Sequence, residues 1–597
     1  MKTPLLFSLA VALSLVACGP QNTEEQQKKP TATPQNAADQ AEAAAAVHAQ
    51  LLAQPQSLAG SWLAGRAAAN ANNWDAASHY FASAYGFDPN NALLFEQALT
   101  ALINNGQVAE ARQLVKLVRD EAAAQKIAPN FSPATAQIMV LLDVLQAVQT
   151  KDWVAAQKAL PQYLDQGFGQ YLKPFLQAWV SVGQGHADTA EKILQASLQS
   201  KPILRNLYHI HLALLAENMG RHKVAEKFYN NALQSNLSIR SVWLAAEFYL
   251  RQNQPQKAIK LVKALQANLP GSPLPPVYLD YLKTANPKAV QATAPQPLEG
   301  LTAVLFDLAS VLQQEQSGRV ALLYAQLARS LNPDDAFVQI LTGDLLATDK
   351  FFDKAQTYYQ AVPKTHPLWV LAQLRAAQTL EEAGKVNAAI TVLENLATMP
   401  HIAPAMHEQM GDVWRRAEKF EQALPHYDRA IAAINKPSEA DWPVFFARGM
   451  CYERLKNWAK AEPDLQQALD LDPENPQILN YLGYSWADQG HNLNKAHDLV
   501  AQALEQAPND AYIMDSMGWV LYKMGKFKAA VRYLEQAASE LADDPVINDH
   551  LGDAYWQAGR QSEARVQWQR AIDQAEGAED QELKKQLQDK LMNGLKP

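Results

Sequence analysis

The chain has 597 residues, more than a single hydrophobic core organises, so its length predicts several domains or a repeat protein. Its formal net charge of −9 argues against a nucleic-acid-binding protein, because such proteins carry clustered Lys and Arg. Apolar residues make up 48% of the chain, with much Ala and Leu, and this composition suits packed helices.

The amino terminus predicts a secretory signal that ends at a lipid-attachment site. Lys2 precedes an apolar run, Leu5 to Val16, which is too short for a membrane-spanning helix. The run ends Leu15-Val16-Ala17-Cys18, which resembles the bacterial lipobox. This resemblance implies that residues 1–17 are a signal peptide, removed before Cys18, and that the Cys18 thiol is lipidated. An ordinary signal followed by an incidental cysteine is the alternative.

The residues after Cys18 predict where the protein resides. Gly19 occupies the position at which Asp retains lipoproteins in the inner membrane. We therefore expect an outer-membrane lipoprotein that faces the periplasm. Residues 18–57 are predicted to form a flexible tether, because Gln21 to Gln35 is rich in Gln, Thr, Glu, Lys and Pro and cannot bury a core.

Residues 58–269 predict a degenerate array of helical hairpins. The small and bulky positions of a two-helix repeat recur from starts near residues 58, 92, 137, 171, 206 and 239. Residues 270–300 then carry seven prolines, from Pro270 to Pro297, which a regular repeat cannot contain. This segment is predicted to be a domain boundary or a joint between two solenoid arrays.

Residues 301–578 predict a second, regular array with a period of 34 residues. Gly449, Gly483, Gly518 and Gly552 recur at intervals of 34, 35 and 34 residues. A large apolar residue follows each glycine, then a small residue and then a bulky one: Tyr452, Trp486, Leu521 and Tyr555; Ala461, Ala496, Ala530 and Ala564; Leu465, Val500, Leu534 and Trp568. This spacing resembles the tetratricopeptide repeat, a helix-turn-helix unit that buries its apolar face by stacking on its neighbours.

The resemblance implies an all-α fold, an α-solenoid of about fourteen repeats in two arrays. Repeats of the second array are expected to start near residues 302, 336, 370, 404, 442, 476, 511 and 545. Residues 579–597 are predicted to form a capping helix and tail, because Leu583, Leu587 and Leu591 form an apolar stripe with a charged outer face.

Catalytic motifs are not recognisable in the sequence. His407-Glu408 begins a zinc-protease pattern, but Gly411 stands where the second histidine ligand is needed. His209 and His211 lie two residues apart and therefore point to different sides of a helix. Cys451 is interpreted as a packed free thiol. We predict that the chain is not an enzyme and binds no cofactor, no metal and no nucleic acid.

The resemblance also implies a binding site for protein partners. In tetratricopeptide repeats the first helix lines a concave groove, and its positions 2, 5, 9, 12 and 13 point into it. Carried onto the last three repeats, these positions are Asn480, Tyr484, Tyr512, Asp515, Trp519, Tyr522, Lys523, Asp549, Asp553 and Trp556. Aromatic rings supply burial and polar groups fix register. The alternative is that the rings pack between helices and the acids form a solvated face.

Residues 302–578 resemble the tetratricopeptide-repeat lipoproteins of proteobacteria. The closest signatures are Asn480 to Trp486, Asp515 to Tyr522 and Asn548 to Trp556. Within this group the chain is similar to outer-membrane lipoproteins that bind a carboxyl-terminal processing protease and deliver peptidoglycan hydrolases to it. This resemblance implies a non-catalytic adaptor or scaffold. A pilotin-like chaperone or assembly factor for an outer-membrane secretion or export machine is the alternative.

Overall fold

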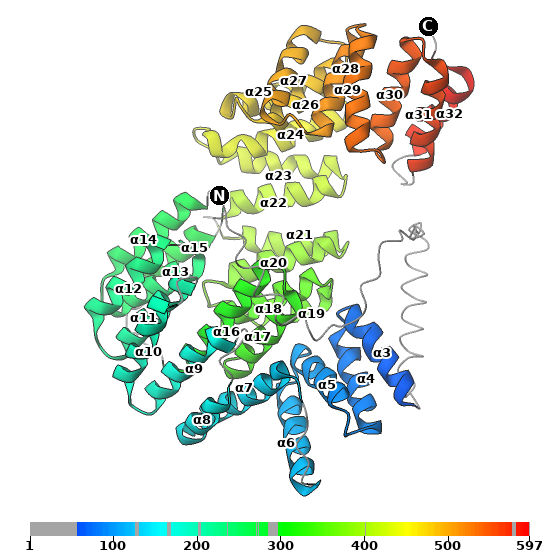
Figure 1. Ribbon diagram of the computed structural model, residues 1–597. Coiled ribbons are helices and arrows are strands. Elements are labelled where there is room, and N and C mark those ends of the chain that lie inside the picture. The colour runs from blue at the N-terminus through cyan, green and yellow to red at the C-terminus, as the bar shows by residue number, and fades with distance from the viewer. Residues whose placement is uncertain are drawn as a thin grey trace. The chain divides into compact units, whose positions relative to one another are not determined.

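Antiparallel helical hairpins make up the part of the chain that the computed structural model describes (Figure 1). The described residues are 57–595 except 126–130, 164–168, 201–203, 236, 270–271, 273, 285–295, 400–401 and 576–580. The predicted signal peptide, Cys18 and all of the tether before Ser57 lie outside them. No described helix is both long enough and apolar enough to span a bilayer.

The described residues divide into two compact units, here called unit 1, which ends at Ile402, and unit 2, which begins at Ala403. Unit 1 contains the helices α3 (Leu58–Asn70), α4 (Trp74–Phe87), α5 (Ala92–Asn104), α6 (Val108–Gln125), α7 (Pro133–Gln149), α8 (Trp153–Ala159), α9 (Gly169–Gly183), α10 (Ala187–Ser200), α11 (Arg205–Asn218), α12 (His222–Ser235), α13 (Ile239–Arg251), α14 (Pro255–Asn268), α15 (Leu274–Thr284), α16 (Pro297–Gln314), α17 (Gly318–Leu331), α18 (Ala336–Thr348), α19 (Phe352–Gln360), α20 (Trp369–Glu382) and α21 (Val386–Ala397).

Unit 2 continues the same pattern of hairpins to the carboxyl terminus. Its helices are α22 (Ala403–Arg416), α23 (Phe420–Ala432), α24 (Trp442–Arg454), α25 (Trp458–Leu471), α26 (Pro476–Asp488), α27 (Leu493–Gln506), α28 (Ala511–Lys523), α29 (Phe527–Glu540), α30 (Pro545–Gln557), α31 (Gln561–Gln574) and α32 (Gln581–Asn593).

The described helices form fourteen hairpins, six from α3 to α14 and eight from α16 to α31. We call the first helix of each hairpin its A helix and the second its B helix. Every A helix begins within five residues of the predicted repeat start, and eight of the fourteen lie in the regular second array. The predicted all-α solenoid is therefore confirmed, and α32 follows as a final unpaired helix.

Local sequence signals set the ends of these helices. Asn475, Asp510 and Asp544 cap α26, α28 and α30, and each side-chain oxygen accepts backbone N–H groups of the first turn. A glycine with positive φ, such as Gly525, follows the A helix of each of these hairpins and turns the chain into the B helix. Caps and turns recur with the same period as the glycines, because each repeat is built the same way.

The repeat glycine marks the closest approach of the A and B helices. A Cβ atom on Gly518 would lie 2.4 Å from Leu534, and one on Gly552 would lie 2.5 Å from Trp568. Both partners are the bulky B-helix residues that the sequence pattern identifies. Glycine at this position lets the two helices cross closely, because any larger side chain would push them apart.

The proline-rich segment does not separate two compact units, so the domain-boundary alternative is wrong. One hydrophobic core runs from Trp74 to Ala376, through residues of both predicted arrays, and the compact units divide between Ile402 and Ala403 instead. Helix α15 lies inside the predicted joint and packs on α14 and α20. The physical reason is that α16 and α17 return to pack on α9 and α5, so that residues before and after the prolines share one core.

Candidate protein-binding face

The inner side of the amino-terminal array is occupied by the chain itself. Helix α16 packs against the A helices α7, α9 and α11, and α17 packs against α5 and α6 (Figure 1). Gly300 of α16 lies so close to Trp179 of α9 that a Cβ atom on it would come within 2.2 Å of the indole ring. The side chains that a partner would meet in a free array therefore contact α16.

A buried polar chain joins the A helices α9, α11 and α13 to α16. The Trp179 indole N–H donates to His211 Nδ1 at 3.1 Å, so the neutral ring carries its proton on Nε2, which lies 3.5 Å from an Asp307 carboxylate oxygen. Burial lowers the pKa of His211, although Asp307 opposes this shift. Arg240 Nε lies 3.1 Å from the other Asp307 oxygen. The sequence did not reveal this link, because its members come from four different repeats.

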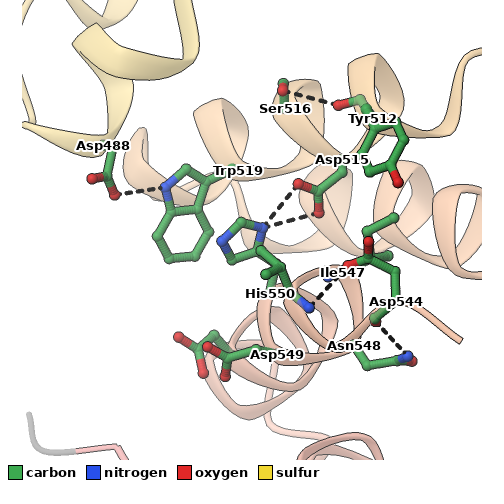
Figure 2. A network of polar contacts seen from close by, with 12 residues as sticks. Asp488, Tyr512, Asp515, Ser516, Trp519, Asp544, Ile547, Asn548, Asp549 and His550 are labelled. Atoms are coloured by element: carbon green, nitrogen blue, oxygen red, sulfur yellow. Dashed lines mark hydrogen bonds and ion pairs between the residues drawn. The ribbon is translucent and has the colours of Figure 1, made fainter. Parts of the chain in front are cut away.

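Unit 2 presents its own A helices side by side. Helix α26 packs against α28, and α28 packs against α30. We use the term A-helix face for the side chains that these three helices direct to one side, which include every predicted groove residue. Figure 2 shows the part of this face around His550, with Asp515 and Trp519 on α28 and His550 on α30.

A buried ion pair lies at the centre of the A-helix face. His550 Nδ1 is 2.9 Å from Asp515 Oδ1 and 3.0 Å from Oδ2, and the His550 ring stacks on Trp519 at a centroid distance of 4.1 Å (Figure 2). Trp519 also stacks on Tyr522 at 4.8 Å, and its indole N–H donates to Asp488. Only 6% of Asp515 and 8% of Trp519 are exposed. Trp519 thus packs between helices, in agreement with the alternative interpretation that the rings are part of the helix packing.

The acids of the last repeat are paired within the chain. Lys590 of α32 donates to Asp549 Oδ1 at 2.6 Å and to Asp553 Oδ2 at 2.9 Å, while the Trp568 indole N–H donates to Asp553 Oδ1. Both aspartates are buried. The alternative that the predicted acids form a solvated face is therefore wrong, because they neutralise His550 and Lys590. Trp556 is half-buried and lies against Gly594 after α32.

The accessible part of the A-helix face lies at Tyr512 and its neighbours. Tyr512 is 58% exposed, and Asn480, Tyr484 and Tyr522 are half-buried. The Asn480 side-chain oxygen is itself buried and has no hydrogen-bond partner among the described residues. Of the predicted groove set, these four residues, Lys523 and Trp556 keep some exposed surface, whereas Asp515, Trp519, Asp549 and Asp553 are buried and hold the face together.

Two groups of this face have shifted pKa values. Burial disfavours the charged form of His550, but the carboxylates of Asp515, Asp549 and Asp553 outweigh it and raise its pKa. Burial and Asp549 raise the pKa of Asp553 to about 6, and Lys590 opposes that shift. Both groups therefore bind a proton more tightly in the folded state than in the unfolded chain.

We expect unit 2 to lose stability as the pH rises from the ordinary pKa of Asp553 through the raised pKa of His550. The contribution of His550 is fully present below its unfolded pKa of ~6.5 and is lost as the pH rises through its raised folded pKa. Asp553 acts in the same direction between its ordinary pKa of ~3.9 and about 6. Hydrogen exchange of α28 to α31 in the full chain measures the effect. The His550→Gln variant should show a flatter pH profile, and identical profiles would contradict this assignment.

Comparison with known proteins agrees with the repeat architecture. Tetratricopeptide-repeat family models match residues 442–475, which cover the hairpin of α24 and α25, and residues 516–579, which cover most of α28 to α31. The chain contains tetratricopeptide repeats. A TPR repeat-containing protein of Pseudomonas aeruginosa is 32% identical over 183 residues, and the match covers 30% of this chain and 30% of that relative.

Several solved structures align with the chain at low TM-scores and low sequence identity. The APC/C hetero-tetramer Cut9–Hcn1 aligns with a TM-score of 0.34 at 15% identity, over 90% of this chain and 97% of that one. A tetratricopeptide repeat protein from Parabacteroides merdae aligns with a TM-score of 0.36 at 15% identity, over 43% of this chain and 99% of that one. MamA aligns with a TM-score of 0.25 at 18% identity, over 32% of this chain and 97% of that one.

The helices of the repeats bury, fully or in part, the cysteine and the two histidines noted in the sequence, Cys451, His209 and His211. Cys451 is buried in the A helix α24, where burial raises the pKa of its thiol to about 12, so the thiol stays protonated. His209 is half-buried beside Phe228, and His211 is fully buried beside Asp307. Within the described residues no group of three or more His, Cys, Asp or Glu could hold a metal ion.

Proposed function

We propose that the protein is a non-catalytic scaffold that holds protein partners on the A-helix face of unit 2. Tetratricopeptide repeats stack into extended surfaces that bind other proteins. The observation that carries the proposal is the contrast between the two units. Helices α16 and α17 fill the inner side of the amino-terminal array, whereas Tyr484, Tyr512 and Tyr522 of unit 2 remain partly exposed on adjoining A helices.

The chemistry of this face suits a protein surface or peptide. Tyrosines combine a large apolar ring with a polar hydroxyl and lose little conformational freedom on binding, which makes them frequent hot spots. Lys523 lies 4.9 Å over the Trp519 ring and Asp488 is half exposed, so the rim of the face carries both signs of charge. The buried ion pair of Asp515 and His550 stabilises the packing of the helices beneath the tyrosines.

Partner capture tests this assignment directly. Tyr512→Ala and Tyr522→Ala should each weaken capture of a bound partner, by ~2 kcal/mol or more if the residue is a hot spot. Tyr533→Ala is the matched control, because Tyr533 lies on the B helix α29. Tagged full-length protein is used to isolate partners from membranes, and their dissociation constants are then measured. Equal affinity of all three variants would refute the A-helix face as the docking site.

We further propose that Cys18 anchors the scaffold to the outer membrane, on the periplasmic side. The run Leu15-Val16-Ala17-Cys18 supports this assignment, and two or three acyl chains give durable anchoring. Cys18→Ser should abolish incorporation of a fatty-acid analogue and release the protein from membranes. Cys451→Ser is the control, since that buried thiol should not be acylated. A Cys18→Ser variant that still labels and sediments would contradict the anchor.

The partners that we propose are a carboxyl-terminal processing protease and the peptidoglycan hydrolases that it degrades. Their support is the resemblance of residues 302–578 to adaptor lipoproteins of such proteases. In a purified system the protein should accelerate cleavage of a hydrolase by the protease, and Tyr512→Ala should reduce that acceleration. Capture of secretin or exporter subunits in place of a protease would instead favour an assembly factor.

A further inference from the structure

A cavity of about 1180 Å³ lies inside unit 1, where the amino-terminal array meets α16, α17 and α18. Trp74 of α4 and Gln97 of α5 line it from one array, and Leu323 and Tyr324 of α17 line it from the other. The cavity therefore exists only because the two arrays pack together. It belongs to a different unit from the A-helix face, and nothing in the proposed scaffold function requires it.

The wall of the cavity is mixed, with apolar surfaces next to uncharged polar groups. Ile138, Leu141 and Leu323 are among the apolar lining residues. The polar lining consists mainly of amide and hydroxyl side chains, which include Gln97, Thr100, Thr135, Gln137, Gln313 and Thr348. Amides and hydroxyls can both donate and accept hydrogen bonds, so the lining suits a ligand that does the same.

The charged residues of the lining are largely committed to one another. Arg319 Nε donates to Asn72 Oδ1 at 2.8 Å, and Asn72 Nδ2 donates to Asp349 Oδ1 at 2.6 Å. Glu315 adds a further negative charge at the rim. An anionic ligand would therefore meet two carboxylates and a guanidinium that is already bonded, which disfavours it. These charges favour an uncharged ligand.

One buried donor in the wall remains without a partner. The Trp74 indole N–H has no hydrogen-bond partner in the part of the chain that the structure describes, although only 6% of Trp74 is exposed. Buried indole N–H groups are normally bonded, because leaving a donor unpaired is costly. The indole nitrogen has no accessible surface, so no molecule in the cavity reaches it and the choice of ligand rests on the rest of the lining.

We infer that the cavity binds a neutral oligosaccharide. A sugar ring has an apolar C–H face, which matches the leucine, isoleucine and aromatic walls, and a rim of hydroxyls that donate and accept in several directions. A hydrocarbon chain would leave the amides of the wall unpaired. The volume exceeds the ~300–1,000 Å³ of ordinary small-molecule sites, which suits several linked rings.

The test measures binding of defined saccharides to the full-length protein. The probes are neutral N-acetylglucosamine, glucose and mannose oligomers, with a sulfated oligosaccharide, a neutral peptide and a medium-chain alcohol as comparisons. We expect at least one neutral oligomer to bind with one-to-one stoichiometry by calorimetry and to protect α4, α5 and α17 in hydrogen exchange. The sulfated oligosaccharide, the peptide and the alcohol should bind more weakly.

Three variants tie the binding to the cavity. Gln97→Leu and Thr100→Val remove polar groups without large changes in shape, and each should weaken binding by up to about tenfold. Ala134→Trp should abolish binding by filling the space. Gln146→Leu, on the exposed side of α7, is the matched control and should bind normally. Failure of every neutral oligomer to bind at millimolar concentration, stronger binding of the peptide or the alcohol, or equal binding by all variants would each overturn the proposal.

Discussion

Asp515→Asn is expected to destabilise unit 2 by about 1–3 kcal/mol, because it removes the buried carboxylate that pairs with the His550 ring. Asp515 and His550 contact each other at 2.9 Å with little exposure of either side chain. Loss of the pair should also loosen Trp519, which stacks on the His550 ring. Hydrogen exchange of α28 to α31 measures the loss locally, which suits a chain with two units better than one global unfolding transition.

Two controls separate this ion pair from a general effect of charge removal. Asp498→Asn removes a carboxylate that is 74% exposed, and it should change stability by less than ~0.5 kcal/mol. The double variant Asp515→Asn, His550→Gln removes both charges and should recover part of the lost stability. Equal protection in Asp515→Asn and Asp498→Asn would show that the pair contributes nothing. Partner capture should be tested at Tyr512, because loss at Asp515 would not distinguish docking from folding.

Gly300→Leu is expected to separate the amino-terminal array from α16. A Cβ atom at this position would come within 2.2 Å of the buried Trp179 ring, and a leucine would add further atoms there. Overpacking of this kind costs about 1–3 kcal/mol or more. Exchange should increase in α9, α11 and α16 together, because the contact among Trp179, His211 and Asp307 depends on the same approach.

Gly318→Leu provides the matched control in the same unit. Gly318 begins α17, and a Cβ atom there would have nothing within 4 Å. This variant should leave exchange in α9 and α11 unchanged. If Gly300→Leu also left it unchanged, α16 would not fill the array as described. The inner side of the amino-terminal array would then be open to partners as well.

The period of the sequence predicted the hairpins well because each repeat encodes its own fold. The glycine at 518, the bulky residue at 534 and the capping residue at 510 act within one hairpin, so local spacing reveals them. Repeat starts in the amino-terminal array were also predicted, although its sequence is degenerate. These features depend on contacts between helices that are adjacent in the chain.

Contacts between distant repeats could not be predicted in the same way. Asp307 meets His211 and Arg240 across the proline-rich segment, and no period relates these positions. The pairing of Lys590 with Asp549 and Asp553 involves α32, which lies outside the repeat. For one of the ion pairs, however, the sequence does contain a signal. Asp515 and His550 lie 35 residues apart on neighbouring A helices, so an acid and a base on adjoining repeats were candidates for an ion pair.

The closed packing of unit 1 should limit how its repeats can change in number during evolution. Gln326 donates to the backbone of Asn104, and Asn72 donates to Asp349, so residues more than 200 positions apart must meet in register. Insertion or deletion of one hairpin between them would shift every such contact. In unit 2 each hairpin packs mainly on its neighbours. Gain or loss of a repeat would therefore change the length of the unit, while the remaining hairpins would still stack in the same way.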